Sequence, residues 1–364
     1  MINVIEIDLR NATYQSGIAK YWSCLAPHMP EDVRTYRVVF YAMAGIRDVR
    51  IVPGDEELSV YMPVGFPSQT LYESVYAFLG ERLVSSKNLI IKSNCLGCEG
   101  LAYLIRSRVW CKTLGVLHCL PHRSMGANGQ FPPANPFFNM DHVIGVCDLA
   151  HEYFNGVKNT RPTSIIYNGL DVPKIKNKKK KDGVFRFIFA NGLSPHKGLQ
   201  RILPAIRHVA SRHPIEVIVL GGCADDVKLA NEFQGLPINY VGLVTDDAVI
   251  QSYYEQADCA LFASFSEACS YAGIEAMAYN LPIISSDAAG LVEMFDKAAL
   301  YAKTGPDGRL DADEYALHML HVIEQSRLRT QLAVRAYARY LARYTAKRMA
   351  SKTVELYRKL LAQS

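Results

Sequence analysis

Two glutamates lie eight positions apart in the stretch "FSEACSYAGIEAMAYNLPIISSD" at residues 265–287. Residues 271–279 are good helix formers, and apolar runs precede and follow them, so the pattern predicts a helix between two buried strands. At about 1.5 Å of rise per residue, Glu267 and Glu275 are at most about 12 Å apart. That span matches a ribose that carries a diphosphate, with one carboxylate at each end.

The start of the predicted helix is suited to an anion, because helix N-termini present free N–H groups and a partial positive charge. We expect the amides of Ala268, Cys269 and Ser270 to hold a phosphate. Glu275 is placed to bind ribose hydroxyls, and Glu267 to meet a sugar beyond the phosphates. The alternative stays open at this point, because glutamates near helix starts also serve as dipole partners or as solvated side chains.

A second set of residues follows another predicted strand, in "GLSPHKGLQRIL" at 192–203. Ser194 and Pro195 predict a helix start, and Lys197 lies in its first turn. A lysine is unusual at the positive end of a helix unless an anion shares the space. Gly192 permits close approach of a ligand to the backbone. The loop "YVGLVTDD" at 240–247, which includes Leu243, ends a further strand and is placed to line a base.

Short apolar runs alternate with helical patterns along nearly the whole chain, which predicts parallel sheets covered on both faces. The expected strands form two series, and we predict an α/β protein with two Rossmann-like, doubly wound parallel-sheet domains. The first series is 2–8, 36–42, 88–93, 113–118, 142–147 and 162–168, and the second is 186–192, 215–222, 238–244, 258–264 and 281–287.

A lysine-rich stretch separates the two series and predicts a solvated linker at residues 169–183. We therefore expect an N-terminal domain at 1–168 and a second domain at 184–340. Residues 341–364 are expected to form a C-terminal helix that packs back on the N-terminal domain.

Composition excludes several classes of protein. The 364 residues are 49% hydrophobic and 21% charged, as in ordinary globular proteins, and lack an apolar stretch of membrane-spanning length. The first residues show no secretory pattern, and nine scattered cysteines suggest reduced thiols, so a cytoplasmic location is expected. A net charge of +5 is too mild to predict a nucleic-acid partner.

Taken together, these motifs resemble the GT-B retaining glycosyltransferases of the family-4 type, known as group 1. The paired-glutamate motif reads "EACSYAGIE", the phosphate motif resembles "GLSPHKG", and the interdomain motif resembles "YNGLD" at 167–171. "AAGLVEMFD" resembles a Gly-x-x-Glu loop and places Glu293 near the site. The resemblance covers nearly the whole chain and implies two domains that face each other across a cleft. It implies that the domain at 1–168 binds the acceptor and that the domain at 184–340 binds the nucleotide-sugar donor.

The resemblance implies a hexosyltransferase that moves a sugar, with retention, from a nucleoside-diphosphate sugar to an acceptor hydroxyl in polysaccharide or glycoconjugate synthesis. UDP is the expected nucleotide of the donor. Lys197 would bind the diphosphate, Glu275 the ribose and Glu267 the donor sugar. In the first half, "YQSGIAKY" suggests Gly17 near the phosphates, and "VLHCLP" suggests His118 at the donor sugar.

The chain departs from the family where an arginine usually follows the strand, because Asn191 and Gly192 stand there instead. Phosphate neutralisation is then expected to depend on Lys197, with His196 or Arg201 as possible helpers. Since a cation and a helix dipole already face the phosphates, we expect no metal cofactor.

The acceptor is open among glycan, lipid-linked and peptide hydroxyls. A Gly- and Pro-rich stretch at 118–138 is a candidate acceptor gate, with a plain loop as the alternative. Residues 103–112 are cationic and aromatic, which allows peripheral membrane contact, although an ordinary amphipathic helix is favoured.

Three other functions compete with a transferase: a nucleotide-sugar epimerase, a non-catalytic nucleotide-binding scaffold, and an NAD-dependent oxidoreductase. The last expects a Gly-x-Gly-x-x-Gly loop after the first strand, which "DLRNATYQSG" lacks. A zinc site is an alternative, since the residue types and spacing of Cys95, Cys98, Cys119 and His122 suit zinc ligands. Cysteines that are simply buried and reduced are the favoured explanation of this pattern.

Overall fold

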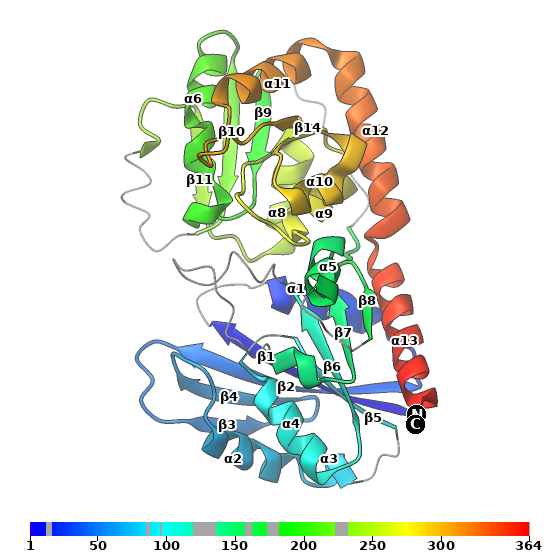
Figure 1. Ribbon diagram of the computed structural model, residues 1–364. Helices are drawn as coiled ribbons and strands as arrows, with labels where there is room; N and C mark the ends of the chain where they lie inside the picture. The colour runs from blue at the N-terminus through cyan, green and yellow to red at the C-terminus, as the bar shows by residue number, and fades with distance from the viewer. Residues whose placement is uncertain are drawn as a thin grey trace. The chain divides into compact units, whose positions relative to one another are not determined.

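The computed structural model describes residues 1–11, 17–84, 88–94, 97–118, 136–156, 162–172, 182–222 and 232–363 (Figure 1). The chain divides into two units, one of residues 1–169 with 346–364 and the other of residues 170–345. The predicted linker at 169–183 lies largely outside the described residues. Each unit is an α/β sheet with parallel strands, which confirms the predicted fold class.

The N-terminal unit contains an eight-stranded sheet in the order β3-β4-β2-β1-β5-β6-β7-β8. All neighbouring strands are parallel except β3 and β4. The strands are β1 (Ile2–Asn11), β2 (Val33–Met43), β3 (Arg50–Pro53), β4 (Glu57–Pro63), β5 (Leu89–Ser93), β6 (Lys112–Leu117), β7 (His142–Gly145) and β8 (Thr163–Ile165).

The described helices of this unit are α1 (Gly17–Leu25), α2 (Gln69–Leu79), α3 (Glu81–Val84), α4 (Glu99–Arg108), α5 (Asp148–Gly156) and the C-terminal α13 (Ala346–Ala362). Within this unit α13 contacts α1, because Leu356, Tyr357 and Leu360 give it one buried face. Short 3₁₀ turns span Ala26–His28 and Pro136–Asn139.

The sequence patterns missed the hairpin of β3 and β4. β3 is a four-residue edge strand with exposed ends, and β4 alternates buried and half-buried side chains. Neither has the continuous apolar run by which the other strands were recognised, so a search for fully buried strands does not find them. β14, described next, was also missed, because its two middle residues are only half-buried.

The C-terminal unit contains a six-stranded parallel sheet in the order β11-β10-β9-β12-β13-β14. The strands are β9 (Phe185–Phe189), β10 (Ile215–Leu220), β11 (Ile238–Gly242), β12 (Cys259–Phe262), β13 (Ile283–Ser286) and β14 (Ala299–Ala302). Described helices are α6 (Leu199–Ala210), α8 (Asp247–Gln256), α9 (Tyr271–Ala278), α10 (Ala289–Phe295), α11 (Ala312–Glu324) and α12 (Ser326–Arg343).

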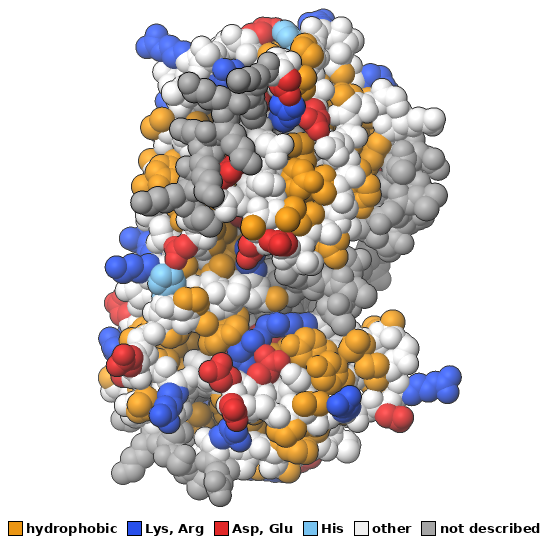
Figure 2. All heavy atoms as spheres, turned by 180° about the vertical axis from the view of Figure 1, so that it is seen from behind, with side chains coloured by type: hydrophobic (Ala, Val, Ile, Leu, Met, Phe, Trp, Pro, Cys, Tyr) orange, Lys and Arg blue, Asp and Glu red, His pale blue; other side chains and the backbone are white. Residues whose placement is uncertain are grey.

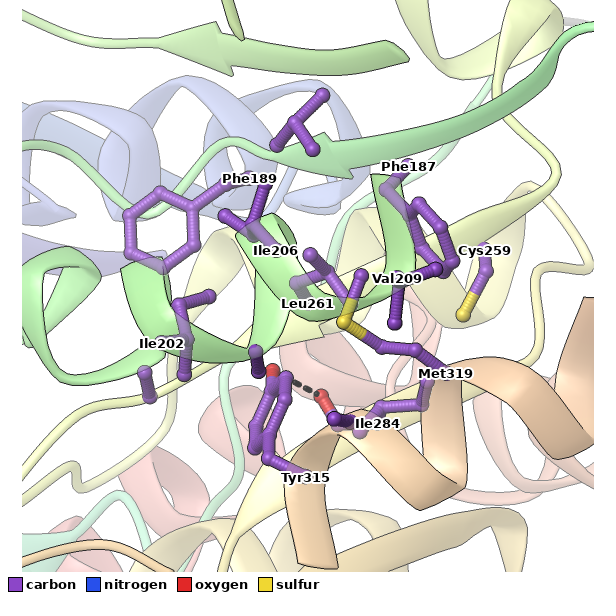
Figure 3. Close-up of a cluster of buried hydrophobic side chains, with 14 of the residues drawn as sticks. Phe187, Phe189, Ile202, Ile206, Val209, Cys259, Leu261, Ile284, Tyr315 and Met319 are labelled. Atoms are coloured by element: carbon purple, nitrogen blue, oxygen red, sulfur yellow. Dashed lines mark hydrogen bonds between the residues drawn. The ribbon is translucent and has the colours of Figure 1, made fainter. Parts of the chain in front are cut away.

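The core of this unit lies where α6 and α11 pack side by side against the sheet. Figure 3 shows Phe187 and Phe189 of β9 with Ile202 and Ile206 of α6, all buried. Tyr315 of α11 is also fully buried, and its hydroxyl donates to the carbonyls of Phe262 and Ile284 at 3.2 Å each. The core therefore fixes the ends of β12 and β13, after which the candidate site begins.

Surface charge of both signs is mixed on the face shown in Figure 2, where described Lys and Arg side chains alternate with Asp and Glu. On α4, Arg106 forms an ion pair with Asp141 and Arg108 with Glu73, so both arginines are paired within the protein. No helix of the described chain is long and apolar enough to cross a membrane.

Candidate active site

The candidate site lies at the carboxyl ends of β9 and β12. Counted within the C-terminal unit, the strand order is 3-2-1-4-5-6, so β9 and β12 are its first and fourth strands. Connections leave these two neighbouring strands toward opposite sides of the sheet, which opens a crevice between their ends. The residues after β9 and after β12 therefore face one another across this crevice.

Lys197 comes from a short turn after β9 rather than from an α-helix. Residues Pro195–Lys197 form a 3₁₀ turn, and α6 begins only at Leu199, so the helix start predicted at Ser194 is wrong. The interruption is Gly198, whose φ of +75° is left-handed. A Cβ atom there would lie 2.2 Å from the carbonyl oxygen of Ala263 at the end of β12. Only glycine allows the two segments this close approach.

Glu267, in the turn between β12 and α9, is at the centre of the site. Its Oε1 atom accepts hydrogen bonds from Lys197 Nζ at 2.5 Å, Asn191 Nδ2 at 2.9 Å and Ser264 Oγ at 2.9 Å. Among the described residues, no hydrogen bond reaches its other oxygen, Oε2. The carboxylate is thus held by one oxygen and presents the other, with 10% of the side chain exposed.

The pKa of Glu267 lies below its ordinary value. Burial alone would raise the pKa, but the charge and hydrogen bond of Lys197, with those from Asn191 and Ser264, outweigh it. For His196, burial and the neighbouring Lys197 lower the pKa. At neutral pH the site therefore contains a carboxylate and one ammonium group in direct contact.

Asn191 was not among the predicted site residues, yet it joins three segments. Its side chain is buried, and Nδ2 donates to Ser264 Oγ at 2.8 Å as well as to Glu267. Its Oδ1 accepts from Ser270 Oγ at 3.0 Å. The signal available in the sequence was a polar amide directly after an apolar strand, one position before Gly192.

Ser270 caps α9, the helix whose first amides were predicted to hold a phosphate. Its Oγ accepts from the N–H of Gly273 at 3.4 Å, and α9 begins at Tyr271 as predicted. Ala268, Cys269 and Ser270 are all buried in the turn before the helix. The helix ends before Asn280, whose φ of +57° is the left-handed conformation that asparagine tolerates.

Glu275 lies within α9 and is buried with 8% of its surface exposed. The hydroxyl of Tyr254, from α8, donates to Glu275 Oε2 at 2.9 Å and stays protonated, since burial and the nearby carboxylate raise its pKa well above the ordinary value. The Tyr254 ring stacks on Tyr279 at 5.0 Å between centroids. Tyr254, also missed from the sequence, therefore fixes the orientation of Glu275.

The ends of β9, β10 and β11 meet through glycines. A Cβ on Gly221 would lie 2.6 Å from Cα of Gly192, and the N–H of Gly221 donates to the carbonyl of Gly242 at 2.8 Å. Leu243 follows and is 53% exposed. The structure thus brings Gly192 and the Leu243 loop to the same edge of the sheet as Lys197.

Arg201, a candidate for phosphate binding in the sequence, forms its hydrogen bonds within the protein. Its guanidinium donates to the carbonyls of Ala263 and Gly308 and to Thr304 Oγ1, and it stacks on the Phe265 ring at 4.0 Å. These contacts tie α6 to the end of β12. In the described part of the site, Lys197 is the cation that remains for an anion.

Gly290 and Glu293, from the motif that resembles Gly-x-x-Glu, lie in the helix α10 and not in a loop. A Cβ on Gly290 would lie 1.8 Å from the carbonyl oxygen of Glu267, so α10 rests directly on the backbone of that residue. Glu293, on the same helix, contributes its carbonyl oxygen to Arg339 Nη2 at 2.6 Å.

The remaining predicted residues, Gly17 and His118, belong to the N-terminal unit. Gly17 begins α1, and Tyr21 of the same helix packs edge-on against His118 at 4.8 Å. Burial, with a contribution from Lys92, lowers the pKa of His118 to about 3, so the ring is neutral at pH 7. Its Nε2 atom is buried and has no hydrogen-bond partner among the described residues.

Lys92 itself is fully buried beside β1. Its ammonium donates to Glu6 Oε1 at 2.7 Å, and Asn94 Nδ2 donates to both Glu6 and Asp8. Burial alone would lower the pKa of Lys92, but the Glu6 carboxylate holds it well above its ordinary value. This buried network fixes β1 against β5 at the switch point of the first sheet.

The zinc alternative and the proposed gate fall mostly outside the described residues. Cys95, Cys119 and His122, like most of 118–138, are not described, whereas the Cys98 side chain is fully buried. Within the ranges that the structure describes, no group of three His, Cys, Asp or Glu side chains could hold a metal ion.

Residues 184–325 match the family model described as "Glycosyl transferases group 1". The O-antigen biosynthesis glycosyltransferase WclY of Escherichia coli is 24% identical over 215 residues. That alignment covers 55% of this chain and 56% of WclY, so the chain matches little more than half of the relative's length.

Solved structures resemble the chain over nearly its full length. HepE of Anabaena, solved in complex with UDP-glucose, superposes with a TM-score of 0.74 at 16% identity and covers 98% of this chain and 99% of its own. The pneumococcal O-GlcNAc transferase GtfA, solved with UDP and GlcNAc, gives a TM-score of 0.75 at 12% identity and covers 99% of each chain. At these identities the likeness concerns the fold.

Proposed function

We propose that this chain is a glycosyltransferase of the GT-B fold that moves a sugar from a nucleoside-diphosphate sugar to an acceptor hydroxyl. The match of residues 184–325, which include the paired glutamates, to the family model "Glycosyl transferases group 1" supports this proposal. One observation carries the activity: Lys197, Glu267 and the capped start of α9 converge at the carboxyl ends of β9 and β12.

Each group has a role in binding the donor. Lys197 and the first amides of α9 bind the diphosphate and stabilise the negative charge that grows on it as it leaves. The carboxylate of Glu275, oriented by Tyr254, binds the ribose hydroxyls. Glu267 meets the donor sugar through its free oxygen, while Gly192 and Leu243 line the nucleotide. No metal cofactor is needed in this scheme.

The transfer proceeds with retention at the anomeric carbon. The bond from that carbon to the phosphate oxygen breaks, and its electron pair stays with the diphosphate. The acceptor oxygen bonds to the anomeric carbon on the same face, and its proton passes to the departing phosphate. His118, neutral at pH 7, contributes a hydrogen bond to the sugar rather than a charge.

UDP is the proposed nucleotide, and the acceptor is proposed to be a glycan or glycoconjugate. Two solved structures of the same fold contain UDP or UDP-glucose, which supports the choice of UDP. The similarity to an O-antigen biosynthesis enzyme supports a polysaccharide acceptor. Peripheral contact with a membrane would be needed only if the acceptor is lipid-linked.

The test is a donor screen with purified protein and UDP-, GDP- and ADP-sugars, with nucleotide release followed by chromatography. Wild type should slowly hydrolyse one donor, and Lys197→Ala or Glu275→Ala should lower that rate by about 100-fold or more. Lys303→Ala is a matched control, because Lys303 lies in the same unit with its side chain 74% exposed. If wild type binds no nucleotide sugar, the chain is a scaffold with the fold alone. Interconversion of sugars without an acceptor would identify an epimerase.

A further inference from the structure

The cation of the site is already paired within the protein. Lys197 Nζ lies 2.5 Å from Glu267 Oε1, and the two side chains are 19% and 10% exposed. Arg201 is committed to backbone carbonyls and the Phe265 ring. Lys197 and Glu267 together therefore carry no net charge, although the proposed ligand is a dianion or more.

Glu267 is also held independently of the lysine. Asn191 Nδ2 and Ser264 Oγ both donate to the same oxygen, Oε1, at 2.9 Å. Asn191 is in turn fixed by Ser270 Oγ, and the hydroxyl of Ser286 holds the Ser264 carbonyl at 2.7 Å. If the ammonium of Lys197 turned toward a phosphate, the carboxylate would keep two hydrogen bonds and its position.

We propose that Glu267 is the resident counter-ion of Lys197, that Asn191 is the positioning residue that retains it, and that a diphosphate competes with Glu267 for the lysine ammonium. This inference rests on the proposed function, since it takes the ligand to be a nucleoside diphosphate. It assigns a role to Asn191, which directly precedes Gly192, the position where the family usually has an arginine.

Competition between the diphosphate and Glu267 for Lys197 would speed release of the product nucleotide. A lysine freed of its counter-ion would bind the product nucleotide tightly and slow its release, whereas a resident carboxylate reclaims the ammonium as the diphosphate leaves.

The first arm of the test is the affinity of UDP measured by isothermal titration calorimetry. Glu267→Gln removes the competing charge and keeps the shape, so UDP should bind about tenfold tighter than to wild type. Glu324→Gln is the matched control, because Glu324 is an exposed carboxylate of the same unit that pairs with His213. Its affinity should equal that of wild type. Structural damage cannot produce tighter binding.

The second arm exchanges the acid and the amide. Asn191→Asp keeps an acceptor for Ser270 but sets a second carboxylate beside Lys197, so UDP should bind about tenfold more weakly. The double variant, Asn191→Asp with Glu267→Gln, restores one acid and one amide in contact. Its affinity for UDP should return to within about threefold of wild type.

The outcomes separate the inference from the function it rests on. If wild type binds UDP and Glu267→Gln binds it no tighter, or if the double variant stays as weak as Asn191→Asp, the counter-ion role is refuted and the transferase stands. If neither wild type nor Glu267→Gln binds UDP, GDP or ADP, the proposed function fails and takes the inference with it.

Discussion

Replacing Gly290 with alanine should damage the site although the position is helical. Gly290 lies in α10, where alanine by itself would stabilise the helix by about 0.5–1 kcal/mol. A Cβ at this position would, however, lie 1.8 Å from the carbonyl oxygen of Glu267, and real Cβ atoms stay beyond 3.0 Å. The two backbones must therefore separate by more than 1 Å.

A displacement of that size changes the contacts of Glu267. Its hydrogen bonds of 2.5–2.9 Å to Lys197, Asn191 and Ser264 would stretch beyond bonding distance. Losing charge-assisted hydrogen bonds and overpacking the contact should together cost about 2–4 kcal/mol. Misplacing a reacting group by about 1 Å can reduce turnover about 100-fold.

Thermal unfolding and kcat/KM for donor hydrolysis would be measured on Gly290→Ala. Val292→Ala is the control, because Val292 is an exposed residue of the same helix, and both quantities should stay near wild type. A Gly290→Ala protein that is as active as wild type and slightly more stable would refute the contact between α10 and Glu267.

Three further outcomes follow from the same geometry. Tyr254→Phe should raise KM for the donor about tenfold with little change in fold, because Glu275 loses its orienting hydroxyl, and an unchanged KM would argue against that role. Since the pKa of Glu267 is lowered on folding, its contribution to stability is complete above about pH 4.5 and is lost as pH falls through the lower folded value. The difference in unfolding free energy between wild type and Glu267→Gln should accordingly shrink as the pH falls below about 4.5, and urea denaturation showing a constant difference would contradict the shift. Lys92→Met should cost about 3–5 kcal/mol by leaving the Glu6 carboxylate buried and unpaired, and adding Glu6→Gln should recover much of it; equal stability of wild type and Lys92→Met would disprove the buried pair.

Much of the fold was predictable from the sequence because fully buried parallel strands give continuous apolar runs. β9 to β13 were each located within a few residues, and so was α9 after its serine cap. β14 is no shorter than β12 and β13, but its two middle residues are only half-buried, and the alternating pattern of β4 was not sought. The lysine of the site was found, but Gly198, in its left-handed conformation, replaced the predicted helix start with a 3₁₀ turn.

The contacts among the site residues were less predictable. Glu267 and Glu275 were identified by type and spacing, whereas Asn191 and Tyr254, which hold them, come from segments 76 and 21 positions away. Sequence spacing reports neighbours within one element, and these partners are brought together only by the order of strands and helices in the sheet. Arg201 shows the converse, since a cation in the right stretch is committed to backbone carbonyls.

A crystal structure of the protein with UDP would test the central claim most directly. It should show the diphosphate against Lys197 and the first amides of α9, with the ribose hydroxyls on Glu275 and the Glu267 carboxylate still bound to Asn191. A nucleotide bound elsewhere on the chain, with Lys197 still paired to Glu267, would contradict it.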